Sequence, residues 1–226
     1  MNFAGNFLFI TKIDVTAMKQ LILDLPDEQW QSESFRQQRY EVHSDTQTIN
    51  LVFDPDFRHT HPTKLPALQM FEPSMRPALG DVAEHYEQSS KGQALLEESG
   101  LGYFIRANLV RLKSGGEIAP HRDGNFSLVH SHRVHLPIIT NDEVRFTVGS
   151  DTINLREGEL YEINNRRTHS VQNAGAEDRV HLIMDYVLPG EKCCCGEKLH
   201  PDTACNPRAC IETDQFRITC SCFPEN

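Results

Sequence analysis

The stretch YFIRANLVRLKSGGEIAPHRDGNFSLVHSHRVHLPIITNDEVRFTV, residues 103–148, decides the fold class. Runs rich in Val, Ile, Phe and Tyr alternate here with turns of Gly, Asn and Asp, and the alternation continues to residue 188. The runs fall at residues 103–112, 132–140, 143–148, 151–155, 159–163, 168–172 and 179–188. Strands this short and this closely spaced predict an antiparallel sandwich of roughly eight strands, a jelly roll.

The N-terminal residues have a different pattern. Apolar residues at helical spacing predict one helix that ends at Pro26 and a second that begins at Ser74. Residues 38–53 indicate two strands, and the proline-rich residues 54–73 indicate an irregular loop. The predicted fold class is therefore mainly β with a helical N-terminal part.

Three regions follow from these changes of pattern. Residues 1–100 form a supporting region of helices and a hairpin, residues 101–190 form the β core, and residues 191–226 form a tail. The tail is set apart because all seven cysteines of the chain follow Lys192, and Pro189-Gly190 marks the boundary.

Composition excludes several classes of protein. The 226 residues are 38% hydrophobic and 24% charged, which favours a folded core over disorder. The net charge of -10 argues against nucleic acid as a partner, because such binding needs a basic surface. No apolar run approaches the ~20 residues of a membrane span, and Met1–Thr11 lacks the features of a secretory signal. We therefore expect no membrane partner and a cytoplasmic location.

A metal-binding pattern stands at the start of the β core. His121 and Asp123 form an HxD pair, and His169 follows far along the chain. On an extended segment, residues two apart point to the same face, so the pair can bind one ion. Two imidazoles and one carboxylate are the ligand set of non-haem Fe(II) with open coordination positions. Taken alone, the HxD pair is a weak signal.

Arg179 strengthens the interpretation. It lies ten residues after His169, across a short turn at 173–175, so two adjacent strands would bring it near the metal. A guanidinium can hold a carboxylate through a charge-assisted, two-pronged contact. His181 and Asp185 share its face of the strand, either close to the site or as ordinary polar residues of the interior.

These motifs, in their order, resemble the aspartyl/asparaginyl β-hydroxylase family. The resemblance covers about residues 100–190 and is carried by four segments. They are Pro120–Asp123, His132–Ile138, Glu157–Ile163 with Thr168–Val171, and Arg179–Asp185. The family consists of Fe(II)- and 2-oxoglutarate-dependent oxygenases on a double-stranded β-helix, a cupin-like jelly roll, and includes bacterial hydroxylases of free amino acids such as proline.

The resemblance implies a role for six residues. His121, Asp123 and His169 would bind Fe(II), and Arg179 would hold the distal carboxylate of 2-oxoglutarate. Arg133 and His135 would lie near the cofactor, at its other carboxylate end. The chemistry implied is oxidation of 2-oxoglutarate by O₂ to succinate and CO₂, coupled to hydroxylation of an aliphatic C–H bond.

The resemblance leaves the substrate open between two classes. The vertebrate peptide hydroxylases of the family lack the carboxylate ligand, whereas Asp123 is present here, which favours an amino acid or an amino-acid-derived small molecule. The alternatives are a peptidyl Asp/Asn β-hydroxylase and a non-catalytic cupin-like module that responds to metal or redox state. The sequence does not indicate the oligomeric state.

The cysteines are the remaining candidate site. Cys193, Cys194, Cys195, Cys205, Cys210, Cys220 and Cys222, with His200, could hold a structural zinc ion. Free or redox-active thiols and disulfides are the alternatives, because no CxxC pair is present. Fe(II) chemistry points to a reducing compartment, which favours metal or thiols over disulfides.

Overall fold

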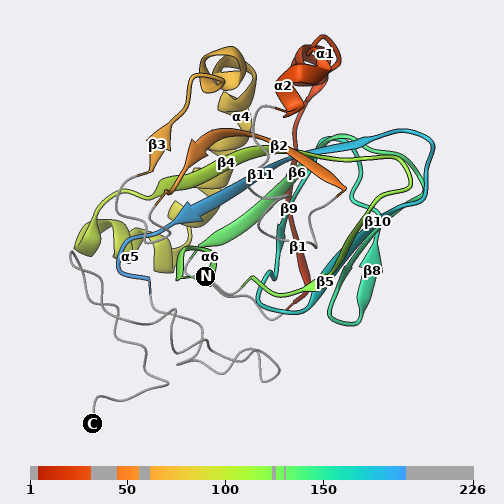
Figure 1. Cartoon of the computed structure of the whole chain (residues 1–226). Coiled ribbons are helices and arrows are strands. Elements are labelled where there is room, and N and C mark those ends of the chain that lie inside the picture. Colours follow the sequence, from red (N-terminus) through yellow and green to blue (C-terminus); the bar gives the residue numbers. More distant parts are fainter. Residues whose placement is uncertain (1–4, 32–44, 56–61, 124–125, 130, 192–226) are drawn as a thin grey trace.

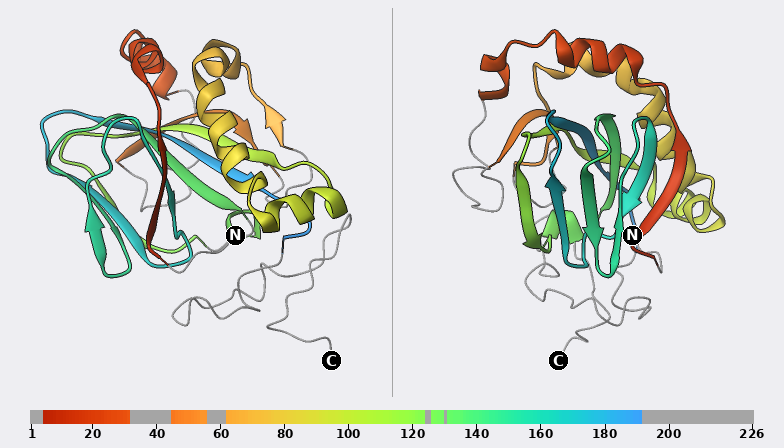
Figure 2. Two further views of the ribbon diagram at one scale, coloured as in Figure 1. Left: turned by 180° about the vertical axis from the view of Figure 1, so that it is seen from behind. Right: turned by 90° about the vertical axis from the view of Figure 1, so that its right-hand side faces the viewer.

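The computed structural model describes residues 5–31, 45–55, 62–123, 126–129 and 131–191. Two antiparallel sheets face each other, and helices cover the outer face of the larger sheet (Figures 1 and 2). The large sheet has the strand order β1-β9-β6-β11-β4-β2-β3, and the small sheet has the order β5-β10-β7-β8. The eight consecutive strands β4 to β11 build the sandwich, which confirms the predicted jelly roll.

The elements follow one another with short connections. The strands before the sandwich are β1 (Phe7–Lys12), β2 (Thr46–Phe53) and β3 (Thr63–Lys64). The helices are α1 (Thr16–Leu23), α2 (Asp27–Gln31), α4 (Leu68–Glu87), α5 (Ser90–Ser99) and α6 (Phe126–Val129). The sandwich strands are β4 (Tyr103–Leu112), β5 (Glu117–His121), β6 (His132–Ile139), β7 (Val144–Val148), β8 (Asp151–Ile153), β9 (Glu159–Ile163), β10 (His169–Asn173) and β11 (Arg179–Val187).

The two faces of the large sheet are chemically different, and this difference positions the site. On β11 the even-numbered residues Val180, Leu182, Met184 and Tyr186 join the core beneath the helices. The odd-numbered residues of β11 face the small sheet instead and include Arg179 and Asp185, which are 0% and 1% exposed. Because side chains alternate along a strand, one strand supplies both the helix-side core and a polar lining for the sandwich.

A second, smaller core fills the space between the sheets. It contains Leu112, Ile118, Val144, Phe146, Val148, Leu155, Ile163 and Val171. This apolar cluster lies on the same side of the large sheet as the buried polar residues, so those residues have little water around them. Electrostatic interactions are stronger in such surroundings than at the surface.

Helix α4 differs from the expectation at its start. It begins at Leu68, six residues before the predicted start at Ser74, and both Pro73 and Pro77 lie inside it. A proline within a helix removes a backbone hydrogen bond. The buried stripe that begins with Leu68, Phe71 and Met75 outweighs this loss, because tertiary packing overrides local propensity.

The N-terminal region contributes strands as well as helices. β1 pairs with β9, and β2 pairs with β4, so both extend the large sheet. β1 was not expected from the sequence. The first strand of the predicted hairpin at 38–53 lies outside the described residues, as does the cysteine tail, whose zinc, thiol and disulfide interpretations stay predictions. The division at residues 100 and 190 also stays a prediction.

None of the helices in the described part of the chain combines the length and apolar character needed to cross a membrane.

Gly92 shows how tightly α5 packs on the end of α4. A Cβ atom at this position would lie 2.0 Å from the carbonyl oxygen of Tyr86, whereas a Cβ at Gly80, within α4, meets nothing within 4 Å. We therefore expect Gly92→Ala to lower the free energy of unfolding by about 1–3 kcal/mol through overpacking. Gly80→Ala should raise it by about 0.5–1 kcal/mol because alanine favours the helix.

Urea unfolding of the two variants measures both effects. A Gly92→Ala protein as stable as the Gly80→Ala protein would show that α5 is not held against α4 as described.

Candidate active site

Three candidate metal ligands meet where the two strands of the small sheet end. β5 and β10 are antiparallel neighbours, and their register places His121 opposite His169. The two imidazole rings lie 4.3 Å apart between centroids, and Asp123 follows directly after β5. Nε2 of His169 lies 3.9 Å from Oδ2 of Asp123, and one ligand atom from each residue falls within a 4.8 Å set. The structure thus brings together the three residues that the sequence singled out.

Backbone carbonyls set the protonation of both imidazoles. Nδ1 of His121 lies 2.8 Å from the carbonyl oxygen of Ala119, and Nδ1 of His169 lies 3.0 Å from that of Arg167. A carbonyl only accepts, so each Nδ1 carries the proton and each Nε2 carries the lone pair. Burial lowers the pKa of His169 more than Asp123 raises it, which favours the neutral, ligating form. Fixing a ligand's tautomer through its second nitrogen is typical of metal sites.

Arg133 orients the carboxylate of the set. Its Nη1 donates to Oδ2 of Asp123 at 2.6 Å, while its Nε and Nη2 donate to the two oxygens of Asp185 at 2.8 Å each. Burial acts to lower the pKa of Arg133, but Asp123 and Asp185 together raise it. The guanidinium is therefore charged and held by two carboxylates, and it connects β11 to the metal ligand.

Asp185 should consequently matter to both stability and metal affinity. Asp185→Asn leaves the Arg133 charge only partly compensated in the interior, and we expect a loss of about 3–5 kcal/mol in the free energy of unfolding. Because Asp123 would be held less firmly, the affinity for Fe(II) should also fall by about 10–100-fold.

The exposed ion pair of Arg156 with Asp142, whose side chain is 81% exposed, offers a matched control. Asp142→Asn should change stability by less than about 1 kcal/mol. Urea unfolding and anaerobic Fe(II) titration measure both variants, and equal effects at the two positions would contradict the proposed role of Asp185.

Arg179 is a buried cation with few partners. Its side chain is 0% exposed, and only Nη2 is hydrogen-bonded, to Nδ1 of His181 at 2.6 Å. Among the described residues, Nε and Nη1 have no hydrogen-bond partner, and no carboxylate forms an ion pair with the group. Burial lowers the pKa of Arg179 to about 9. A buried charge in this state is costly, which indicates that the guanidinium is completed by an anionic ligand.

A pocket between the sheets connects the metal ligands with Arg179. Its polar lining is His121, Arg133, His135, His169 and Arg179, and its apolar lining includes Ile118, Phe146, Ile163 and Val171. The six residues predicted from the sequence therefore converge: five line this pocket and Asp123 is bonded to Arg133. An apolar pocket with a few convergent polar groups is the usual form of a small-molecule site.

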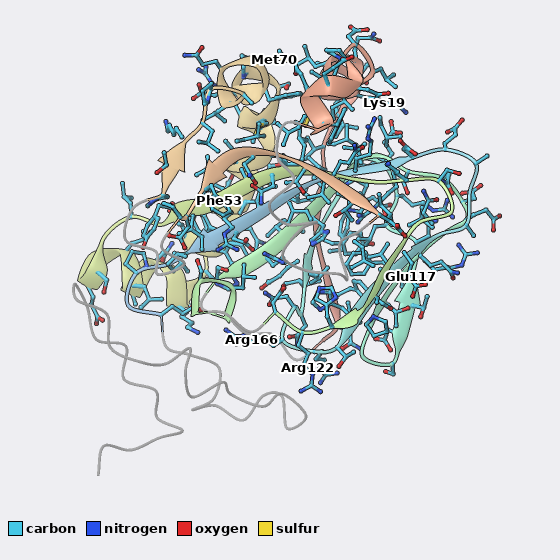
Figure 3. All side chains as sticks on the ribbon, in the orientation of Figure 1. Lys19, Phe53, Met70, Glu117, Arg122 and Arg166 are labelled. Atoms are coloured by element: carbon cyan, nitrogen blue, oxygen red, sulfur yellow. The ribbon has the colours of Figure 1, made fainter. Side chains whose placement is uncertain are left out.

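The mouth of the site is formed by loops. The amide of Asp123 donates to the carbonyl of Asn165, and the side chain of Asn165 donates to the carbonyl of Leu128 in α6. Arg122 and Arg166 lie at this end of the sandwich, opposite the end that carries Lys19 and Met70 (Figure 3). Asn125 and His130, which the sequence also placed near the site, lie outside the described residues.

Sequence reasoning left two contributors open. His181 and Asp185 were placed on the face of Arg179 without a role, and the structure shows both in contact with site residues. Phe146 was not singled out at all, although its ring meets His135 edge-on at 5.3 Å and lies 5.8 Å from the Arg179 guanidinium. The alternation along its strand signals burial for Phe146, but not its position against the site.

Comparisons with known proteins agree with this geometry. A family model described as Aspartyl/Asparaginyl beta-hydroxylase matches residues 77–189, half of the chain. No curated protein sequence matches significantly.

Among solved structures, the fold resembles an oxidoreductase of the 2OG-Fe(II) oxygenase family from Burkholderia pseudomallei. That protein is 13% identical, the match covers 90% of this chain and 88% of the other, and the TM-score is 0.52. A viral collagen prolyl hydroxylase from Paramecium bursaria Chlorella virus-1, in a 2OG complex, matches at 10% identity over 80% and 96% of the two chains, with a TM-score of 0.47. A cupin domain from Bordetella pertussis Tohama I matches at 23% identity over 36% and 79%, with a TM-score of 0.29.

The family match includes the whole sandwich and every residue of the pocket described above. It also favours the enzymatic interpretation over a non-catalytic binding module. The chain belongs to the aspartyl/asparaginyl β-hydroxylase family and is an oxygenase of the hydroxylase type.

Proposed function

We propose that this protein is an Fe(II)- and 2-oxoglutarate-dependent dioxygenase that hydroxylates an aliphatic C–H bond of an amino acid or an amino-acid-derived small molecule. In the overall reaction, 2-oxoglutarate, O₂ and the substrate C–H give succinate, CO₂ and the alcohol. One oxygen atom enters succinate and the other enters the product, so atoms and electrons balance. The iron supplies the oxygen-activating chemistry.

The observation that carries the proposal is the pairing of two different sites in one pocket. One is a set of two imidazoles and a carboxylate, with both imidazole lone pairs placed on Nε2 by carbonyl contacts. The other is the Arg179 guanidinium, buried without an anionic partner among the described residues. The first set fits Fe(II), and the second fits the far carboxylate of a dicarboxylic acid.

The chain's own residues have three tasks in this proposal. His121, Asp123 and His169 would hold the iron, with Arg133 fixing the orientation of the Asp123 carboxylate. Arg179 would bind the distal carboxylate of 2-oxoglutarate, and the apolar wall around Phe146 and Val171 would exclude water from its carbon chain. His135 lines the same pocket and would contact the bound cofactor.

Asp123 supports a small-molecule substrate, because the vertebrate peptide hydroxylases of the family lack this ligand. The chain offers the full two-histidine, one-carboxylate set. A peptidyl Asp/Asn residue is the alternative, and the assay described below separates the two.

The first test is anaerobic visible absorption of the purified full chain. Addition of Fe(II) and then 2-oxoglutarate should produce a charge-transfer band that requires both components. The band should weaken in Arg179→Gln and should be absent in His169→Ala. A full-length protein that shows no band with both components present would refute the proposed cofactor pair.

The second test identifies the substrate class. Succinate formation is compared with free L-amino acids and with Asp- or Asn-containing peptides under the same conditions. Stimulation by a free amino acid, with a matching hydroxylated product by mass spectrometry, supports the proposal. Stimulation by peptides alone would replace it with the peptidyl hydroxylase.

A further inference from the structure

Three buried polar side chains form a continuous chain inside the sandwich. Arg179 and His181 stand on the inner face of β11, and His135 stands on the inner face of the neighbouring strand β6. Nη2 of Arg179 lies 2.6 Å from Nδ1 of His181, and that same Nδ1 lies 3.4 Å from Nδ1 of His135. One nitrogen of His181 thus meets both neighbours.

The shared nitrogen of His181 must carry a lone pair. A guanidinium only donates, so a contact of 2.6 Å with Nδ1 of His181 requires that Nδ1 accept. His181 is 0% exposed, and burial, followed by the charge of Arg179, lowers its pKa well below the usual value. The ring is therefore neutral, with its single proton on Nε2.

The protonation of His135 follows from that of His181. Burial and then Arg179 also lower the pKa of His135 well below its usual value, so this ring is neutral as well. Two lone pairs facing each other at 3.4 Å would repel, so Nδ1 of His135 carries the proton and points it toward His181. Nε2 of His135 then carries a lone pair, and in the described residues it has no hydrogen-bond partner.

We propose that His181 is a positioning residue: its Nδ1 lone pair holds the Arg179 guanidinium in place and selects the tautomer of His135. The pocket then presents N–H donors of Arg179 to an anion, beside an acceptor, Nε2 of His135, that suits an N–H or O–H donor. A carboxylate cannot bond to that Nε2, so His135 contacts a different group of the bound ligands than Arg179 does. The proposal rests on the proposed function to the extent that Arg179 binds 2-oxoglutarate.

A pair of substitutions separates the lone pair of His181 from its bulk. His181→Asn keeps an acceptor, Oδ1, near the position of Nδ1, whereas His181→Leu fills the space without an acceptor. We expect His181→Leu to weaken 2-oxoglutarate binding by about 10-fold or more, the size of a lost charge-assisted hydrogen bond. His181→Asn should stay within about 3-fold of the original protein, because a neutral acceptor still meets the guanidinium.

Binding is measured by anaerobic calorimetric titration of 2-oxoglutarate into the Mn(II)-loaded full chain, which needs no turnover. Thermal unfolding of both variants confirms that they fold. Equal weakening in the two variants would show that the ring's shape, not its lone pair, matters, and would overturn the proposal.

Nitrogen-15 NMR of the unsubstituted protein gives a readout that a purely structural role would not produce. Long-range nitrogen–proton spectra should show His181 as the Nε2–H tautomer and His135 as the Nδ1–H tautomer. In His181→Leu, His135 should lose this preference. A protonated His181, or one with its proton on Nδ1, would overturn the proposal without any variant.

Arg179→Gln separates failure of this inference from failure of the proposed function. If Arg179→Gln abolishes 2-oxoglutarate binding and His181→Leu leaves it unchanged, only the role of His181 is wrong. If Arg179→Gln itself leaves binding unchanged, the assigned cofactor site is wrong.

Discussion

Replacing His169 with alanine should reduce iron-dependent succinate formation by at least about 100-fold, a larger effect than loss of an outer hydrogen-bond partner of a metal ligand produces. His169 is 5% exposed and supplies one of three ligand atoms that lie within 4.8 Å of one another. With that imidazole removed, His121 and Asp123 would bind Fe(II) weakly, and the iron would not be held opposite the cofactor pocket.

The matched control is His85→Ala, the same chemical change on the exposed side of α4. Both variants are assayed for Fe(II) affinity by anaerobic titration and for succinate by chromatography. His85→Ala should retain the original rate. Substantial succinate formation by folded His169→Ala protein would exclude this residue as an iron ligand.

Replacing Arg179 with methionine should have two opposite effects. Binding of 2-oxoglutarate should weaken by about 30–1,000-fold, because truncation of one partner of a buried, hydrogen-bonded charge pair costs about 2–4 kcal/mol. In contrast, the ligand-free protein should gain about 1–3 kcal/mol in the free energy of unfolding. The substitution removes a buried cation whose Nε and Nη1 have no partner among the described residues.

Differential scanning calorimetry with and without 2-oxoglutarate measures both effects in one experiment. The surface substitution Arg145→Met is the control, and it should leave the cofactor-induced stabilisation intact. A ligand-free Arg179→Met protein that is markedly less stable than the original would show that the guanidinium is already satisfied in the resting pocket.

The sandwich could be predicted from the sequence because its strands are short, β-branched and separated by turn residues. The predicted runs at 103–112 and 159–163 coincide with β4 and β9. β1 was missed because a short apolar run without turn residues on both sides does not reveal its partner, β9. The start of α4 was missed because Pro73 and Pro77 dominate local propensity, while the packing that overrides them is a tertiary property.

The metal ligands and Arg179 were predictable from motif spacing, since the HxD pair, the distant histidine and the arginine are recognisable along the chain. The connection of Asp123 to Asp185 through Arg133 was not, because three strand segments far apart in sequence must fold before these charges meet. The shared parity of Arg179, His181 and Asp185 correctly placed them on one face. Parity alone does not reveal which nitrogen of His181 accepts a hydrogen bond.

The alternation along β11 also separates two evolutionary pressures that in most strands act together. Substitutions at Val180, Leu182 or Met184 affect the core under the helices, so they would be felt in the cell as protein abundance. Substitutions at Arg179, His181 or Asp185 alter charges in the pocket, so selection would act on them chiefly through turnover. A lineage could therefore adapt to a hotter habitat through one set of positions and to a new metabolite through the other, with neighbouring residues of a single strand evolving on separate schedules.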